Sequence, residues 1–288
     1  MKTIYLLLIV SLGLLNMSYA AEKNEKYVLE TGDKARERLE LQNNLLAKDA
    51  YAHLEKAKLS KDMIVWDIGC GVGAMTSYLA DKVGPNGHVY ALDISQEQLK
   101  TAENRIRSEG HKNVTFIKGD ISELENTSKN PADLIYMRFV LMHLVHPENA
   151  LEKIKPLLKQ GGVIVSQESI MSTIAQGKPI IDDYVGVVMA LGKHNNVNYD
   201  IGNRLEDLYK NAGFKPVKTY YNHQKIPAAD FKKMLLMGLS EWKNKAIEIN
   251  LLTADKVAAW EKEIEAIPTN DPNFMFSLAK QAHVLAWK

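Results

Sequence analysis

Cysteine is almost absent from this chain of 288 residues, in which Cys70 is the single example. An intramolecular disulfide is therefore excluded, and so are zinc or iron–sulfur sites built from several cysteines. The sequence also lacks an excess of charge of one sign, because 36 Lys and Arg residues balance 35 Asp and Glu residues. A global basic field is thus absent, and we expect no nucleic-acid partner.

Long apolar runs are missing too, and only the N-terminus comes near to one. Lys2 precedes the apolar run Ile4–Leu15, and the small residues Ser18 and Ala20 follow it. This pattern is typical of a secretory signal peptide over residues 1–20, cleaved after Ala20, and the run is too short to span a bilayer comfortably. We therefore expect an exported protein, periplasmic or secreted, with no transmembrane span after cleavage. If the signal is false, the protein is cytoplasmic.

The rest of the chain has an ordinary globular composition, with 46% hydrophobic and 25% charged residues, and shows no fixed-period repeat. Strand-like and helix-like segments alternate along it. The predicted strands cover residues 63–68, 88–94, 114–117, 132–137, 163–166, 217–221 and 283–287, the last as an edge strand. The predicted helices cover most of 27–58, then 74–83, a segment opened by a Ser95/Gln98 capping box, 147–158 stopped by Gly161-Gly162, and 205–212.

This alternation predicts an α/β fold, a doubly wound and mostly parallel sheet with helices on both faces. Residues 170–200 and 226–280 are too long for simple connections, so we expect helical insertions over the site late in the chain. Ligands of such sheets bind outside the carboxyl ends of the strands.

The most informative motif is a glycine-rich loop that leaves the first predicted strand. The segment Asp67-Ile68-Gly69-Cys70-Gly71-Val72-Gly73 leads into a helix, and its glycines let the backbone turn tightly and approach a ligand. Asp93 ends the second strand, where a carboxylate can accept both hydroxyls of a ribose. Asp120 follows the third strand, where it can accept from an adenine amino group. Three acids beside one glycine loop suit a ligand with an amine, a ribose and an adenine.

The stretch resembles the class I S-adenosylmethionine-dependent methyltransferases, in a bacterial methyltransferase-domain branch. The resemblance covers roughly residues 27–225 and the last strand, and includes Arg36-Glu37-Arg38-Leu39, Arg138–Leu144 and Gly202–Leu205. It implies a seven-stranded sheet and an enzyme that uses S-adenosyl-L-methionine. The residues implied to bind this cofactor are Gln42, Asp67, Gly69, Cys70, Gly71, Gly73, Asp93, Ile94, Asp120, Ile121 and Arg138.

The resemblance also implies how the mature chain is organised. Residues 21–288 form a single methyltransferase domain with an N-terminal helical segment over 21–60 and a cofactor-binding core over 61–225. A helical cover over 226–280 and a last strand over 281–288 complete it.

Two rival functions remain open. Gly69, Gly71 and Ala74 satisfy a relaxed dinucleotide fingerprint, which would suit an NAD(P)-dependent oxidoreductase. Asp67, Gly73 and Asp120 favour S-adenosylmethionine instead. The other rival is a non-catalytic binding or secreted interaction protein on the same fold.

The sequence indicates less clearly which residues act on the methyl acceptor. His143 is the candidate proton acceptor. His143 and His146 lie three apart near Glu148, but a metal site needs further converging ligands, so we expect no metal. The late insertions mix apolar and aromatic residues, among them Tyr184 and Trp242, which suits a small or lipid-like acceptor more than DNA. A protein acceptor stays open.

Overall fold

The computed structural model describes residues 33–124, 131–174 and 177–288. The predicted signal peptide over 1–20 and the start of the N-terminal helical segment lie outside these residues. The strands are β1 (Ile64–Ile68), β2 (His88–Asp93), β3 (Val114–Lys118), β4 (Ala132–Arg138), β5 (Leu158–Ile170), β6 (Val217–Asn222), β7 (Lys225–Pro227), β8 (Met275–Ser277) and β9 (Lys280–Trp287). The α-helices are α2 (Asp33–Lys56), α3 (Ala74–Val83), α4 (Gln96–Ser108), α5 (Pro147–Ile154), α6 (Pro179–His194), α7 (Leu205–Asn211), α8 (Ala228–Glu248) and α9 (Ala254–Glu265).

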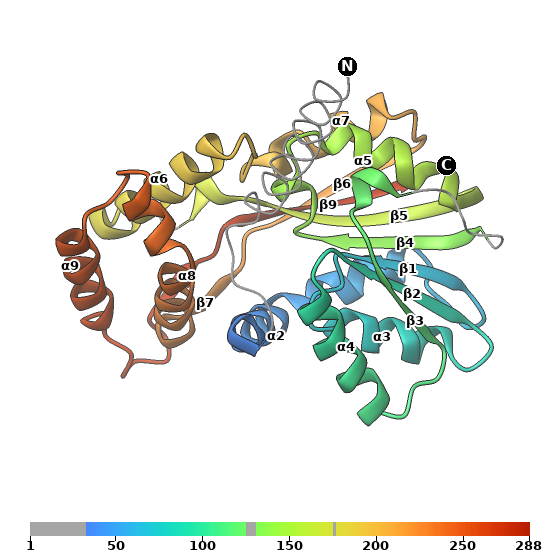
Figure 1. Cartoon of the computed structure of the whole chain (residues 1–288), viewed down its shortest axis with the longest axis horizontal. Helices are drawn as coiled ribbons and strands as arrows, with labels where there is room; N and C mark the ends of the chain where they lie inside the picture. The colour runs from blue at the N-terminus through green and yellow to red at the C-terminus, as the bar shows by residue number, and fades with distance from the viewer. Residues whose placement is uncertain (1–32, 125–130, 175–176) are drawn as a thin grey trace, which may run out of the picture.

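Seven of these strands form one twisted sheet in the order β3-β2-β1-β4-β5-β9-β6 (Figure 1). Strands β1 to β5 pair in parallel, and β9 pairs antiparallel with both β5 and β6. The predicted doubly wound, mostly parallel seven-stranded sheet is therefore confirmed.

The last strand, predicted at an edge, lies inside the sheet, and that prediction was wrong. Residues 281–286 are buried on both faces of β9, as expected for a strand with a neighbour on each side. Its second neighbour, β6, lies far earlier in the chain, and no local pattern in the sequence reveals that pairing.

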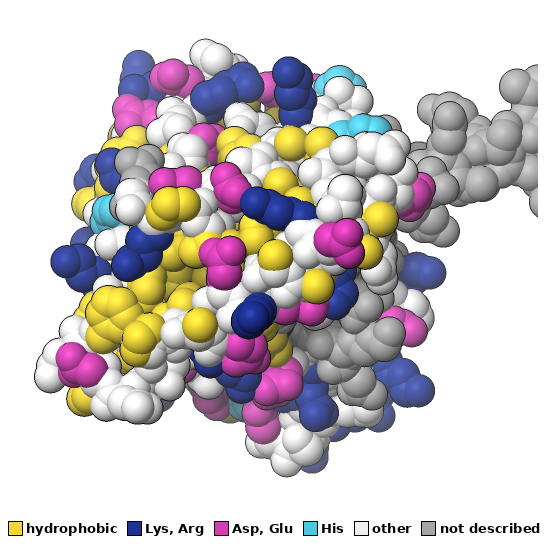
Figure 2. Space-filling model, turned by 90° about the vertical axis from the view of Figure 1, so that its left-hand side faces the viewer, with side chains coloured by type: hydrophobic (Ala, Val, Ile, Leu, Met, Phe, Trp, Pro, Cys, Tyr) yellow, Lys and Arg dark blue, Asp and Glu magenta, His cyan; other side chains and the backbone are white. Residues whose placement is uncertain are grey.

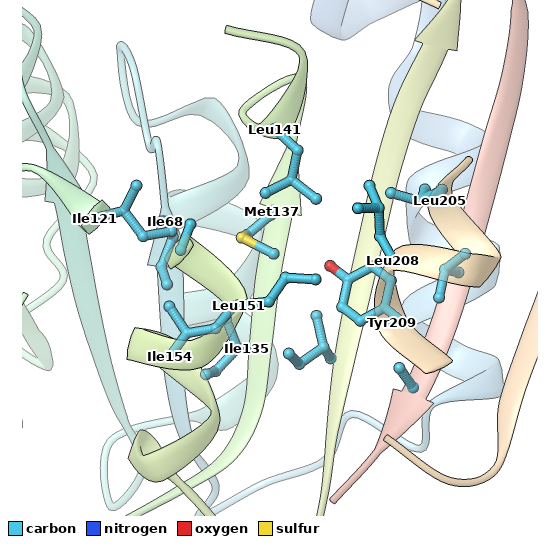
Figure 3. Packing of buried hydrophobic residues seen from close by; sticks show 14 of the residues in the cluster. Ile68, Ile121, Ile135, Met137, Leu141, Leu151, Ile154, Leu205, Leu208 and Tyr209 are labelled. Carbon is cyan, nitrogen blue, oxygen red and sulfur yellow. The ribbon is translucent and has the colours of Figure 1, made fainter. Parts of the chain in front are cut away.

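Helices cover both faces of the sheet, as its apolar strands require. Helices α2, α3 and α4 lie on one face, and α5 and α7 lie on the other (Figure 1). Figure 3 shows the second layer, in which α5 and α7 pack on β4 through Ile135, Met137, Leu151, Ile154, Leu205, Leu208 and Tyr209. This packing fixes the strand ends on which the site is built.

The segment after α5 differs from the prediction. The helix ends at Ile154, a short 3-10 turn with Pro156 follows, and β5 begins at Leu158. Gly161 and Gly162 therefore lie inside β5, where the pairing with β4 shifts register, and they do not stop a helix. Proline removes a backbone donor, so it ends the helix before the glycines are reached.

The late insertions form a separate layer beside the sheet. Helices α6, α8 and α9, with the small two-stranded antiparallel sheet of β7 and β8, enclose their own apolar core, to the left in Figure 1. We call this layer the cover; the helical insertions predicted for 170–200 and 226–280 correspond to it. In the described parts of the chain, no helix combines the length and apolar character needed to cross a membrane.

Candidate functional site

The glycine loop lies at the carboxyl ends of β1 and β2. Gly69, Gly71 and Gly73 all have positive φ, at 71°, 54° and 78°. The backbone N–H groups of Gly69 and Cys70 both donate to the carbonyl of Leu92, at 2.8 and 3.0 Å. This conformation favours glycine, so the loop motif follows directly from its backbone.

The three glycines face different neighbours. A Cβ at Gly69 would lie 2.4 Å from Val140, and one at Gly73 would lie 2.9 Å from Ala102 of α4. Among the described residues, a Cβ at Gly71 would meet only Leu39, at 3.7 Å. Gly69 and Gly73 are thus required for packing, whereas the described residues leave space at Gly71 in which a ligand can approach the backbone.

Asp93 connects the loop to the next helix. Its Oδ2 accepts from the backbone N–H of Gly71 at 2.9 Å, and its Oδ1 accepts from that of Ser95 at 2.9 Å. Ser95 caps α4 by accepting from the N–H of Gln98 at 3.3 Å, but Asp93 takes the place of Gln98 in the other half of the predicted capping box. Burial raises the pKa of Asp93. Each carboxylate oxygen retains a second acceptor site for a ribose hydroxyl.

Asp67 is the most buried acid of the motif, with 2% of its surface exposed. Its Oδ2 accepts a 2.6 Å hydrogen bond from Thr76 in α3, a partner that the sequence did not reveal. Burial raises the pKa of Asp67 to about 6, while the positive charge of Arg138 opposes the shift.

The adenine side of the predicted site carries Ile94, Asp120 and Ile121. Ile94 follows β2 with 54% of its surface exposed, whereas Ile121 is buried. The Oδ1 of Asp120 accepts from the backbone N–H of Ser122 at 2.8 Å, which caps a short 3-10 turn. An exposed apolar residue beside an acid suits a flat ring with an amino group.

Gln42 of α2 and Arg138, the last residue of β4, lie in the same region. Gln42 is half-buried on α2, and Nη2 of Arg138 donates to Oδ1 of Asn43 on the same helix at 2.9 Å. Nη1 of Arg138 is buried and has no hydrogen-bond partner within the described residues.

Cys70 is a buried free cysteine whose thiol pKa is raised well above its usual value by burial, so the thiol stays protonated at neutral pH.

His143 lies in a short 3-10 turn held by a buried acid. Oε1 of Glu168 accepts from the backbone N–H groups of Val140 and Leu141, at 3.0 and 2.7 Å. Burial raises the pKa of Glu168 to about 8. Burial and the nearby charge of Arg38 lower the pKa of His143 to about 4, so its ring is neutral at pH 7. Sequence analysis missed Glu168, because no local motif separates it from an ordinary strand residue.

No group of three His, Cys, Asp or Glu side chains that could hold a metal ion occurs within residues 33–124, 131–174 and 177–288.

The sheet order and the glycine loop define a class I S-adenosylmethionine-dependent methyltransferase. Residues 59–209, just over half of the chain, match the methyltransferase domain family, and the chain belongs to that family. The demethylmenaquinone methyltransferase of Lactococcus lactis is 29% identical over 173 residues, which cover 55% of this chain and 68% of the relative. The enzyme of that name from Anoxybacillus flavithermus is 26% identical over 57% of this chain and 75% of its own length.

Solved structures agree with this fold. The YcgJ protein of Bacillus subtilis superposes with a TM-score of 0.54 at 17% identity, over 82% of this chain and 96% of its own. A phosphoethanolamine N-methyltransferase from Haemonchus contortus, in complex with S-adenosylhomocysteine, gives 0.51 at 16% identity, over 88% of this chain and 52% of its own. The [4+2]-cyclase SpnF superposes with a TM-score of 0.51 at 17% identity, over 82% of this chain and 78% of its own. Because one neighbour is a cyclase, the fold alone does not specify the reaction.

The residues present fit S-adenosyl-L-methionine. Gly71 leaves open space at the loop, Asp93 has spare acceptor capacity, and Ile94 offers an exposed apolar surface. The buried Nη1 of Arg138 can donate to the carboxylate of the methionine part. The roles of the individual residues remain predictions, and the cofactor class follows from the family.

Proposed function

We propose that this enzyme methylates a small, lipid-like acceptor of the quinone type. The observation that carries the proposal is the continuity of the site with the apolar cover. Phe139 and Met171 pack against both the sheet core and the core of the cover. Seen from the side of the cover, the surface carries a hollowed patch of hydrophobic side chains bordered by charged ones (Figure 2). The names of the sequence relatives point to an acceptor of this kind, since demethylmenaquinone is a quinone.

The three acids of the predicted cofactor site each have a task in this proposal. Asp93 accepts from the ribose, Asp120 accepts from the adenine amino group, and Asp67 faces the methionine amine. S-adenosyl-L-methionine supplies a methyl group activated by its sulfonium. The protein therefore has to orient the acceptor and exclude water more than to activate it.

His143 is proposed as the proton acceptor. Its pKa is lowered to about 4, so the ring is neutral at pH 7 and can accept a proton, as a weaker base than an ordinary imidazole. Glu168 orients the turn that carries it. Removing the ring should slow the chemical step and leave the cofactor site intact.

The test uses the chain without residues 1–20, methyl-labelled S-adenosylmethionine and a reduced short-chain demethylmenaquinone. We expect a labelled product and S-adenosylhomocysteine in equal amounts. His143→Ala should lower kcat about 100-fold, whereas His146→Ala, at an exposed neighbouring histidine, should change it less than about twofold. Cofactor binding without any transfer would instead support a non-catalytic binder, and NAD binding would support the oxidoreductase.

We further propose export by residues 1–20. The proposal rests on the charged start, short apolar run and small residues before Ala21. Export conflicts with the supply of S-adenosylmethionine, which is normally scarce outside the cytosol. N-terminal sequencing of the protein from each compartment tests it: a chain that begins at Ala21 outside the cytosol is expected, and an intact Met1 confined to the cytosol would contradict it.

A further inference from the structure

Arg38 lies where helix α2 crosses the glycine loop. The next residue, Leu39, is the one neighbour in the described part of the chain within 4 Å of a Cβ built on Gly71. Only 12% of the Arg38 side chain is exposed, so this arginine does not lie on a solvated helix face. A guanidinium at this depth needs partners.

One partner comes from the cover, 203 residues further along the chain. Nε of Arg38 donates to Oε1 of Glu241 in α8 at 2.7 Å, and the Glu241 side chain is 3% exposed. Tyr184 of α6 lies close enough for both charges to act on its hydroxyl, which donates to the carbonyl of Leu235 at 3.2 Å. The ion pair therefore sits on the boundary between the cofactor loop and the apolar cover.

The pair leaves part of the guanidinium unused. Nη2 of Arg38 is buried and has no hydrogen-bond partner among the described residues. A buried donor without a partner is destabilising, and apolar side chains could join α2 to α8 at lower cost. A role as a simple tether thus does not account for this arginine.

The chemistry of the unused nitrogen restricts what can meet it. A guanidinium only donates, so the ligand must present an oxygen or another acceptor atom. Glu241 already balances the charge, so a neutral carbonyl or hydroxyl oxygen is suitable. The surroundings of Arg38 include His143, whose pKa is lowered by burial and by the charge of Arg38. The cover contributes apolar and aromatic side chains such as Trp242, whose ring lies edge-on to Tyr184 at 5.0 Å.

We infer that Nη2 of Arg38 binds a ring oxygen of the methyl acceptor, and that Glu241 positions the guanidinium for it. The acceptor class is therefore an aromatic ring with a hydroxyl or carbonyl group, embedded in an otherwise apolar molecule. This inference rests on the proposed function, because it concerns the acceptor of the same reaction. Arg38 is then a substrate-binding residue, and Glu241 is a positioning residue.

The test compares two probes that differ only in their oxygens, 1,4-dihydroxynaphthalene and naphthalene. Quenching of tryptophan fluorescence reports binding to the protein saturated with S-adenosylhomocysteine, under anaerobic conditions. The native protein should bind the dihydroxy probe about 10- to 100-fold more tightly, as expected for one hydrogen bond from a charged donor. Arg38→Met/Glu241→Met should remove this preference and keep the affinity for S-adenosylhomocysteine.

The chain offers a matched control. Lys233 and Glu37 also join α8 to α2, at 2.7 Å, but both side chains are exposed. Lys233→Met/Glu37→Met should retain the preference for the dihydroxy probe. If the first double variant fails to fold, Arg38→Lys keeps the positive charge but has no second nitrogen, and it should also lose the preference.

Retention of the preference in a folded Arg38 variant would overturn the inference, and so would equal or absent binding of the two probes by the native protein. The proposed function fails separately. If oxygen-dependent binding depends on Arg38 but no methyl group reaches a quinol, only the function is wrong; if methyl transfer occurs and the Arg38 variants keep it, only the inference is wrong.

Discussion

The cofactor side and the acceptor side of this enzyme are assembled in different ways. The predicted cofactor side uses a contiguous loop and the ends of neighbouring parallel strands, with Asp93 joined to Gly71 across 22 residues. The proposed acceptor side joins Arg38 to Glu241 across 203 residues, from two helices that share no motif. A binding site built from one βα unit is readable in a sequence, whereas a site built between a core and its insertions is not.

The largest effect on cofactor binding is expected for Gly71→Val. Its Cβ would enter the open space at the loop, and its positive φ is unfavourable for valine. We expect S-adenosylhomocysteine affinity to fall at least about 100-fold, equivalent to about 2.8 kcal/mol. Calorimetry measures the affinity and a melting curve measures the fold.

Gly110 supplies the control for that variant. It has a φ of 85°, a Cβ placed on it would have no atom of the described segments within 4 Å, and it lies after α4, away from the loop. Gly110→Val should destabilise the protein through the backbone alone and leave cofactor affinity unchanged. A folded Gly71→Val protein with native affinity would show that the loop is only a turn.

Asp93→Ala should have the next largest effect. Its carboxylate holds two backbone N–H groups and is proposed to hold the ribose, so both stability and affinity depend on it. We expect a loss of about 2–4 kcal/mol in binding, or about thirty- to several-hundred-fold. Asp93→Asn keeps one acceptor oxygen, so its cofactor affinity should lie between those of the native protein and Asp93→Ala. Unchanged calorimetric affinity in a folded Asp93→Ala variant would place the ribose elsewhere.

The cofactor half of the fold could be predicted because its signals are local. The positive φ of Gly69, Gly71 and Gly73 requires glycine, and β1 to β4 are short apolar runs bounded by turns. The prediction was wrong where strand pairing determines the structure. Strand β9 has a second neighbour, β6, and Gly161-Gly162 lie inside β5. Thr76 and Glu168 were missed because their partners are fixed only by packing across α3 and the turn at Val140.

The free energy of unfolding should depend on pH through Glu168, which holds the turn that carries His143. The pKa of Glu168 in the folded protein is raised to about 8, so the stability it contributes is present at acidic pH and is lost as pH rises toward 8. Each unit by which the pKa differs between the folded and unfolded protein corresponds to about 1.4 kcal/mol in the free energy of unfolding. Denaturant unfolding from pH 5 to pH 8 should therefore show a steeper loss of stability in the native protein than in Glu168→Gln.

The exposed Glu152 of α5 is a suitable control for the buried acid. Glu152→Gln should leave the pH dependence of unfolding as it is in the native protein. Identical slopes for the native protein and Glu168→Gln would contradict the raised pKa, and would mean that the backbone N–H groups of the turn stabilise the carboxylate of Glu168 enough to offset its burial.

The smallest effect is expected at Cys70. Its thiol is buried and protonated, and its side chain packs with Ala91 and Leu99. Cys70→Ala should cost about 1 kcal/mol in unfolding and change cofactor affinity less than about twofold. Loss of methyl transfer in this variant, or sensitivity of the native enzyme to mild oxidant, would reveal a role for the thiol that its burial argues against.

The separation of the two sides is tested most directly by one calorimetric comparison. S-adenosylhomocysteine is titrated into the native protein, Asp93→Ala and Arg38→Met/Glu241→Met. We expect native affinity in the double variant and a loss of at least about thirty-fold in Asp93→Ala. Equal losses in both folded variants would contradict it, because the cofactor and acceptor sides would then form one inseparable site.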